Sequence, residues 1–212
     1  MPFLREITPG IGIRAGIWQI TESEETLLGM VNLSSSETAT YASFGNELRK
    51  RQWLAYRILL KHLLTPQSSD IIYDLHGKPF LRSGSHCISV SHAGELAAVV
   101  CSPLHPAGID IEKIKDRVIR VKERFLQEKE LKVLPAENHL EQLYVYWGGK
   151  EALYKLHGKP DVDFRNDIYI HPFDYLCITN KHGRATLTVG SHSKDYELFY
   201  QKIGEYMLVI AY

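Results

Sequence analysis

The sequence lacks an excess of charge of either sign. Of its 212 residues, 25 are Lys or Arg and 25 are Asp or Glu, so the formal net charge is zero. The residues up to 105 and those from 106 onward are each balanced as well. Proteins that grip duplex nucleic acid over a broad face need a basic surplus. We therefore expect no nucleic-acid partner, although a small local basic patch remains compatible with this balance.

Long apolar runs and paired cysteines are also missing. The longest apolar stretch, residues 96–101, falls far short of the roughly 18–20 residues that a membrane span needs. The first residues do not combine a basic start with an apolar run, as a secretion signal would. Cys87, Cys101 and Cys177 form no CxxC pair, which fits a reducing compartment. We predict a cytoplasmic protein with no membrane partner.

Two long segments have the periodicity of helices. Apolar residues recur at helical spacing over residues 47–64 and 140–157, and Pro66 and Pro160 follow them as stop signals. A charged helical stretch is expected from 113 to about 134, and residues 34–47 are either a loop or the start of a helix. Strands are expected at residues 11–20, 71–75, 87–91, 95–101 and 107–112, and between 168 and 212 with turns at 181–184 and 190–194.

The best candidate boundary is residues 102–106, which contain two prolines. Each side of this boundary carries strands and one long helix. The sequence therefore predicts an α+β fold with two similar halves, residues 1–105 and 106–212, which act as one functional unit. No convincing repeat is visible in the letters themselves.

Two carboxylates share one face of the expected strand at 107–112. Side chains alternate along a strand, so Ile109 and Ile111 point into the core while Asp110 and Glu112 share the other face. Oxygen ligands in this arrangement suit a hard divalent cation such as Mg²⁺. The alternative is a half-exposed strand whose polar face happens to be acidic.

The second long helix contains a further carboxylate. Glu151 and Lys155 lie one turn apart, and Trp147 lies one turn before Glu151. Glu151 would complete a metal site if this helix packs beside Asp110; otherwise Glu151 and Lys155 form an ordinary surface ion pair. The adjacent Gly148 and Gly149 cost a helix about 1 kcal/mol each, and they indicate either close approach of another segment or a kink.

Several polar groups could bind phosphate or an acidic partner. Ser91 and His92 end a strand at a turn that could hold a phosphate, although a capping serine and a surface histidine would look the same. A serine hydrolase is disfavoured because the serine is not in a GxSxG elbow. Lys78 lies in a Gly-Lys-Pro turn, and residues 49–51 are all basic. Residues 113–124 carry a net charge of +4, which suits an acidic macromolecule or simply a solvated helix.

Taken in order, these motifs resemble those of the 4′-phosphopantetheinyl transferase superfamily. The motifs are Gly77-Lys78-Pro79, Ser91-His92, Asp110-Ile111-Glu112 and Lys150-Glu151-Ala152 through Lys155. Each motif is weak alone, whereas four in this order and spacing are specific. The segments 51–57 and 124–130 are also similar to the family, so the resemblance covers residues 11–160. The match is to the longer type, similar to the surfactin-synthetase activator.

The resemblance implies a particular reaction. Members move the phosphopantetheine arm of coenzyme A to a serine of an apo acyl or peptidyl carrier protein and release adenosine 3′,5′-bisphosphate, with magnesium at the pyrophosphate. The implied fold has two similar α/β halves related by a pseudo-two-fold, with coenzyme A as co-substrate in the cleft between them. A monomer is expected, because both halves are in one chain.

The resemblance also assigns roles to individual residues. It implies that Glu151 and Lys155 are catalytic, with Glu151 as the base, directly or through a water. Magnesium would be held by Asp110, Glu112 and Glu151. Coenzyme A would contact Lys78, Pro79, Ser91, His92, Asp110, Lys150 and Lys155, with Arg49 and Arg51 as weaker candidates and His92 at the 3′-phosphate. The carrier protein would dock on Lys113, Lys115, Arg117, Arg120 and Arg124.

Two other functions remain open at this point. One is a degenerate coenzyme A or carrier-protein binding module without catalysis. The other is another magnesium-dependent phosphoryl enzyme, such as a nuclease that uses Asp110, Glu112 and Lys155. The three converging acids argue against the first function, and the balanced charge argues against the second.

Overall fold

The computed structural model describes residues 3–64, 69–103, 105–135, 139–175 and 181–212, and it confirms the expected α+β class. The strands are β1 (Phe3–Gly10), β2 (Ile13–Gln19), β3 (Ile71–Tyr73), β4 (Pro79–Leu81), β5 (Cys87–Ala93), β6 (Leu96–Ser102), β7 (Gly108–Lys113), β8 (Ile168–Ile170), β9 (His182–Val189), β10 (His192–Ile203) and β11 (Tyr206–Ala211). The helices are α1 (Glu24–Leu28), α2 (Ser35–Ser43), α3 (Glu47–Leu64), α4 (Arg117–Phe125), α5 (Glu128–Leu131) and α6 (Leu140–His157).

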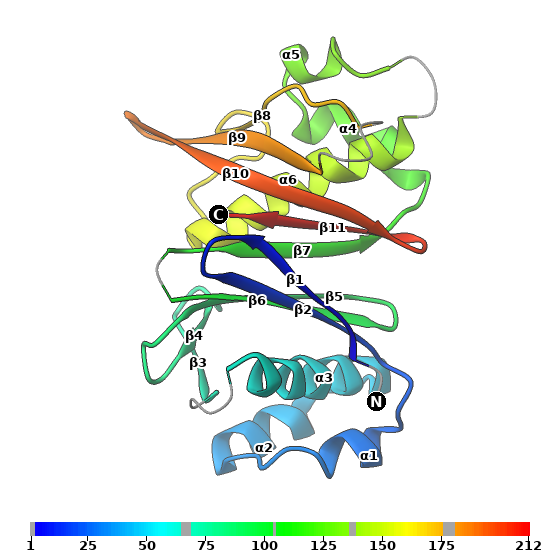
Figure 1. Ribbon diagram of the computed structural model, residues 1–212, viewed down its shortest axis with the longest axis vertical. Helices are drawn as coiled ribbons and strands as arrows, with labels where there is room; N and C mark the ends of the chain where they lie inside the picture. The colour runs from blue at the N-terminus through cyan, green and yellow to red at the C-terminus, as the bar shows by residue number, and fades with distance from the viewer. Residues whose placement is uncertain (1–2, 65–68, 104, 136–138, 176–180) are drawn as a thin grey trace.

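Two antiparallel sheets lie between two layers of helices (Figure 1). The first sheet has the order β1-β2-β6-β5 and the second has the order β7-β11-β10-β9-β8, while β3 and β4 form a separate hairpin. Helices α1 to α3 cover the first sheet at one end of the molecule, and α4 to α6 cover the second sheet at the other end. Every strand of the first sheet precedes residue 103 and every strand of the second follows residue 107, while the division into halves at 105/106 stays a prediction.

Three apolar clusters hold these layers together. Helix α3 buries Leu59 and its neighbours against the first sheet, and α6 buries Leu153 and its neighbours against the second. The third cluster lies where the two sheets meet and includes Ile17, Ile109 and Ile111. The inward direction expected for Ile109 and Ile111 is therefore confirmed. Burial of such side chains is the main favourable contribution to folding, at about 25 cal/mol per Å² of apolar surface.

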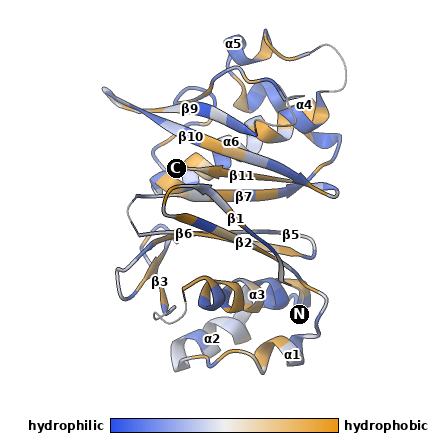
Figure 2. Ribbon diagram, viewed as in Figure 1, coloured by the Kyte–Doolittle hydropathy of each residue, from blue (hydrophilic) through white to orange (hydrophobic). Residues whose placement is uncertain are grey.

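The two long helices begin and end where the sequence predicted, at residues 47–64 and 140–157. Helix α6 ends at Gly158, whose φ of 79° is the left-handed conformation that glycine adopts at many helix C-termini. Residues 35–43 form α2, which begins with a capping box between Ser34 and Glu37. None of the α2 side chains is buried. Figure 2, in which apolar residues are orange, shows little orange on α2.

The structure corrects several boundaries. The expected turn at 181–184 is wrong, because β9 begins at His182 and Gly183 pairs with Leu198 of β10. The turn expected at 190–194 is confined to Gly190 and Ser191, since β10 begins at His192. The charged stretch after 113 forms two short helices, α4 and α5, and β1 was not expected. Cys177 and Pro66 lie outside the described residues. Within the described part of the chain, no helix is long and apolar enough to cross a membrane.

Candidate active site

The edge strands of the two sheets, β5 and β7, are joined through serine side chains. Ser89 and Ser91 lie on the same face of β5 because residues two apart on a strand point the same way. Ser89 Oγ accepts a hydrogen bond from the Ile109 N–H at 3.3 Å, and Ser91 Oγ accepts one from the Ile111 N–H at 3.2 Å. The strand that carries the predicted carboxylates is thereby fixed to the strand that carries Ser91 and His92.

A lysine, a serine and an aspartate meet where β5 contacts β7. Lys155 Nζ donates to Asp110 Oδ1 at 2.7 Å, to Ser91 Oγ at 3.0 Å and to the Ile109 carbonyl at 3.2 Å. Ser91 Oγ donates to Asp110 Oδ1 at 3.1 Å. Asp110 is only 4% exposed. Residues that were expected to act together therefore do come together, from β5, β7 and α6.

Among the residues that the structure describes, the second carboxylate oxygen of Asp110 is buried without a hydrogen-bond partner. It faces α6 at Gly148, where an added Cβ would lie 3.6 Å from Asp110 Oδ2 and 2.8 Å from Val209 Cγ2. The glycine pair therefore marks close approach of α6 to the sheet, one of the two explanations that the sequence left open. A buried carboxylate oxygen costs free energy unless it finds a partner, so Oδ2 is suited to a cation.

Negative charge is concentrated around Asp110. Burial raises the pKa of Glu151 to about 7, and repulsion from Asp110 adds to this, while Lys155 acts in the opposite direction. The pKa of Glu112 is also raised, first by burial and then by Asp110. Lys155 lies among these three carboxyl groups, and Arg117 Nη2 lies 3.9 Å from Glu112 Oε2. A divalent cation would add the positive charge that three clustered carboxylates need.

The residues present fit a bound Mg²⁺ by their chemistry. Asp110, Glu112 and Glu151 supply carboxylate oxygens, which are the ligands that Mg²⁺ prefers. In the described ranges, no set of three or more His, Cys, Asp or Glu side chains is already arranged as a metal centre. The predicted metal site therefore stays a prediction, supported by the unpartnered Asp110 Oδ2 and the raised pKa values of its two neighbours.

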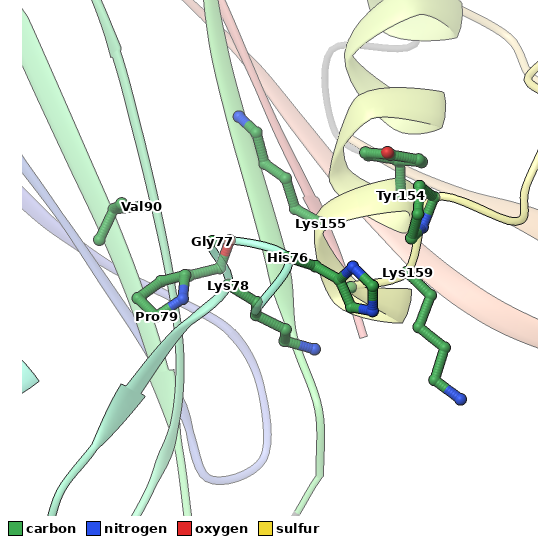
Figure 3. Close-up of a pocket in the computed structure, with 11 residues that line it drawn as sticks. His76, Gly77, Lys78, Pro79, Val90, Tyr154, Lys155 and Lys159 are labelled. Carbon is green, nitrogen blue, oxygen red and sulfur yellow. The ribbon is translucent and has the colours of Figure 1, made fainter. Parts of the chain in front are cut away.

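All three carboxylates line one cavity of about 430 Å³. Its walls come from both sides of the molecule and consist of Thr40, Phe44, Arg49, Trp53, Tyr56, Tyr73, Gly77, Pro79, Val90, Ser91, His92, Asp110, Glu112, Glu151 and Lys155. A neighbouring pocket of about 290 Å³ shares Gly77, Pro79, Val90 and Lys155 with it. Figure 3 shows this second pocket, in which Lys155 and Lys78 point in opposite directions.

One face of the main cavity was not expected from the sequence. It is formed by aromatic side chains of α3 and its neighbours, among them Phe44, Trp53, Tyr56 and Tyr73. Tyr56 Oη lies 2.9 Å from Tyr73 Oη. Trp53 and Tyr56 belong to the segment 51–57 that is similar to the family, but no role in the site was expected for any of the four, and only the fold brings them to the cavity that Asp110 lines.

Two candidate phosphate ligands, His92 and Arg49, contact each other through His92 Nε2 and Arg49 Nη1. Burial lowers the pKa of His92 to about 4, and the charges of Arg49 and Lys155 contribute in the same direction. His92 is therefore neutral near pH 7. Arg51 does not line the cavity; it lies 3.7 Å from Glu47 and 3.4 Å from Glu95. The structure thus brings only Arg49 of this pair to the site.

Lys78 reaches across to the end of α6. Its Nζ donates to the Leu156 carbonyl at 2.5 Å, and a side chain at Gly158 would collide with Lys78 Cδ at 2.3 Å. A cation is favourable at a helix C-terminus because it complements the helix dipole. Burial lowers the pKa of Lys78. Lys78 lines the smaller pocket next to Pro79, so both stay candidates for ligand contact.

The expectation that Lys150 touches coenzyme A is corrected by its position. Lys150 has an exposed fraction of 0% and lines neither pocket. Its Nζ donates to Glu130 Oε2 at 2.9 Å and to two backbone carbonyls. Successive residues on a helix point about 100° apart, so the neighbour of a cavity-facing Glu151 faces elsewhere. Membership of the motif therefore does not place Lys150 at the cavity.

The basic patch lies on and before α4. Lys115, Arg117, Arg120 and Arg124 are exposed, whereas Lys113 pairs with Glu205 at 3.0 Å. Two hollows of about 270 and 450 Å³ lie beside the patch, and Trp147 lines both of them. The aromatic wall that Trp147 forms there was not anticipated from the sequence.

Comparisons with known proteins agree with this geometry. A family model described as the 4′-phosphopantetheinyl transferase superfamily matches residues 106–211. The chain is 33% identical over 119 residues to the 4′-phosphopantetheinyl transferase AcpT of Escherichia coli strain K12, covering 52% of this chain and 59% of that relative. It is 32% identical over 152 residues to the 4′-phosphopantetheinyl transferase psf-1 of Bacillus pumilus, covering 67% and 62%. The chain therefore spans about three fifths of the length of these relatives.

Proposed function

Because the chain belongs to the 4′-phosphopantetheinyl transferase superfamily, we propose that it transfers the 4′-phosphopantetheine arm of coenzyme A to a serine of an apo carrier protein. The second product is adenosine 3′,5′-bisphosphate. The observation that carries the proposal is the cluster of Asp110, Lys155 and Glu151 in a cavity shared by both sheets. A phosphoryl transfer needs charged groups that are held in place around the reacting phosphate, and these three come from separate elements of the fold.

The proposed reaction assigns each charged side chain a task. The carrier serine oxygen forms a bond to the phosphorus that bears pantetheine, and the phosphoanhydride bond to the nucleotide breaks. Glu151 accepts the serine proton, directly or through one water. Lys155, held by Asp110 and Ser91, stabilises the charge that develops on the phosphate oxygens.

Magnesium would be held by Asp110, Glu112 and Glu151. When bound, it would neutralise charge on the pyrophosphate of coenzyme A. The chain's own contribution is to keep Asp110 Oδ2 free of other partners and to hold Oδ1 through Ser91 and Lys155.

The nucleotide end of coenzyme A would lie against the β5 side of the cavity. Ser91, His92 and Arg49 line this side, and Arg49 supplies the positive charge that a 3′-phosphate needs. The neutral His92 ring adds a hydrogen bond to the phosphate. Lys78 and Pro79 extend this region into the smaller pocket.

The carrier protein would dock on α4 and the segment before it. Carriers of the family are acidic, and four exposed basic side chains beside Trp147 complement them. We place the reaction in the cytoplasm and expect a monomer. The free thiols of Cys87 and Cys101 support a reducing compartment, and a cavity built from one chain needs no second subunit.

The test is a mass spectrum of an apo acyl carrier protein after incubation with this protein, coenzyme A and Mg²⁺. The expected result is a gain of roughly 340 Da, the mass of the transferred arm. Coenzyme A binding without any mass gain on fatty-acid, polyketide or peptide carriers would favour the degenerate binding module. Absence of both binding and mass gain would refute the proposal.

A further inference from the structure

A second buried charged pair lies outside the cavity, and the proposed reaction gives it no task. Lys150 and Glu130 both have an exposed fraction of 0%, and Lys150 Nζ lies 2.9 Å from Glu130 Oε2. Burying two charges costs free energy, and apolar residues of the same size often stabilise a protein more than a buried charged pair does. The pair therefore requires an explanation other than simple stabilisation.

The hydrogen bonds of this pair connect three segments. Lys150 Nζ, on α6, also donates to the Phe164 carbonyl at 2.9 Å and to the Ile168 carbonyl at 2.6 Å. Glu130, on α5, accepts from the Ile170 N–H and the Gln127 N–H, both at 2.7 Å. Lys150 therefore fixes the backbone that leads into β8 against both α5 and α6.

Phe164, whose carbonyl accepts a hydrogen bond from Lys150, lines the larger hollow beside the basic patch. The Phe164 ring lies between Trp147 and Tyr154, with ring centroids 5.7 and 5.5 Å away. Phe164 and Trp147 form the wall of the hollow of about 450 Å³ that also includes Arg124. Trp147 and Tyr154 flank Lys150 on α6 by one turn on each side.

We propose that Lys150, neutralised by Glu130, is a positioning residue that holds Phe164 against Trp147 and so fixes the carrier-facing wall relative to Glu151. The proposal rests on the proposed transfer to a carrier protein. Because Lys150 lines neither pocket that would hold coenzyme A, its loss changes the use of the carrier and leaves coenzyme A binding as it is.

The test compares three variants with the wild-type protein. The double variant Glu130→Gln and Lys150→Met removes both charges together, which avoids leaving one charge buried alone. Phe164→Ala keeps the buried pair and removes only the ring that the pair holds. Lys132→Met, at an exposed position just after α5, is the matched control.

The measurements are the steady-state KM and kcat for an apo carrier protein, the Kd for coenzyme A with Mg²⁺, and hydrogen exchange of residues 162–170. The expected result for both the double variant and Phe164→Ala is a carrier KM raised about fivefold or more, with kcat and the coenzyme A Kd nearly unchanged. The double variant also exchanges faster at residues 162–170, and Lys132→Met matches wild type throughout.

Two results overturn the proposal. One is a Phe164→Ala protein with an unchanged carrier KM, which is decisive even where the double variant fails to fold. The other is a coenzyme A Kd that rises as much as the carrier KM. A wild-type protein that transfers nothing refutes the proposed function instead, and the exchange rates of the double variant then still decide whether Lys150 holds this wall.

Discussion

Replacing Gly108 with alanine should separate α6 from β7. A Cβ at this position would lie 1.9 Å from the Ala152 carbonyl oxygen and 3.0 Å from the Leu156 nitrogen, both backbone atoms of α6. An ordinary van der Waals contact is 3.4–4 Å, so the helix must retreat by about 1.5 Å. Glu151 and Lys155 lie on that stretch of helix, and the 2.7 Å contact between Lys155 Nζ and Asp110 Oδ1 would be lost.

The expected magnitude follows from the size of this displacement. Overpacking of this kind costs about 1–3 kcal/mol, which lowers Tm by about 2–12 °C in a chain of this length. A misplacement of about 1 Å at a reacting centre slows a reaction about a hundredfold, so activity should fall much further than stability.

The assay is transfer to an apo carrier protein, measured beside the melting curve of each variant. Gly45→Ala is the matched control, because a Cβ there has no neighbour within 4 Å. A Gly108→Ala protein with the Tm and the transfer rate of wild type would refute the packing of α6 on β7 described above.

Three further predictions follow from the site. Asp110→Ala should leave cooperative unfolding intact but slow transfer at least about a hundredfold, and Glu151→Gln should do the same; near-normal turnover of either variant contradicts its role. Replacing Arg117 and Arg120 with Glu should raise the carrier KM about tenfold, whereas weaker coenzyme A binding would assign the patch to the nucleotide. The pKa of His92 lies near 4 in the folded protein against an ordinary 6.5, so the unfolded chain binds this proton first as pH falls. As the pH is lowered from about 6.5 to 4, the free energy of unfolding should therefore decrease. Measured by urea titration, this decrease should be smaller for His92→Gln than for wild type, and equal decreases would contradict the lowered pKa of His92.

Features that depend on neighbours in the sequence could be predicted. The bounds of α3 and α6 follow from helical periodicity and from the stop signals after each helix. The alternation around Asp110 placed Ile109 and Ile111 in the core. The motifs that resemble the family supplied the residues of the cluster, although not their geometry.

Features that depend on the meeting of distant segments could not be predicted. Ser89 and Ser91 bond to the backbone of a strand in the other sheet, which no periodicity indicates. Lys150 was assigned to coenzyme A because it belongs to the motif that contains Glu151, yet its partner is Glu130, twenty residues earlier. The turn expected near Gly183 was wrong because pairing with β10 outweighs the local turn signal.

The hydrogen bonds of Ser89 and Ser91, which join β5 to β7, allow the relative motion of the two sheets to be measured. The N–H groups of Ile109 and Ile111 are bonded to single hydroxyl groups and not to a continuous backbone ladder. Any separation of the sheets must therefore break these two bonds, and their exchange rates report the frequency of that opening. Since Ser91 also contacts Lys155 and Asp110, a ligand that bridges the cavity has to slow exchange at two amides that it does not touch.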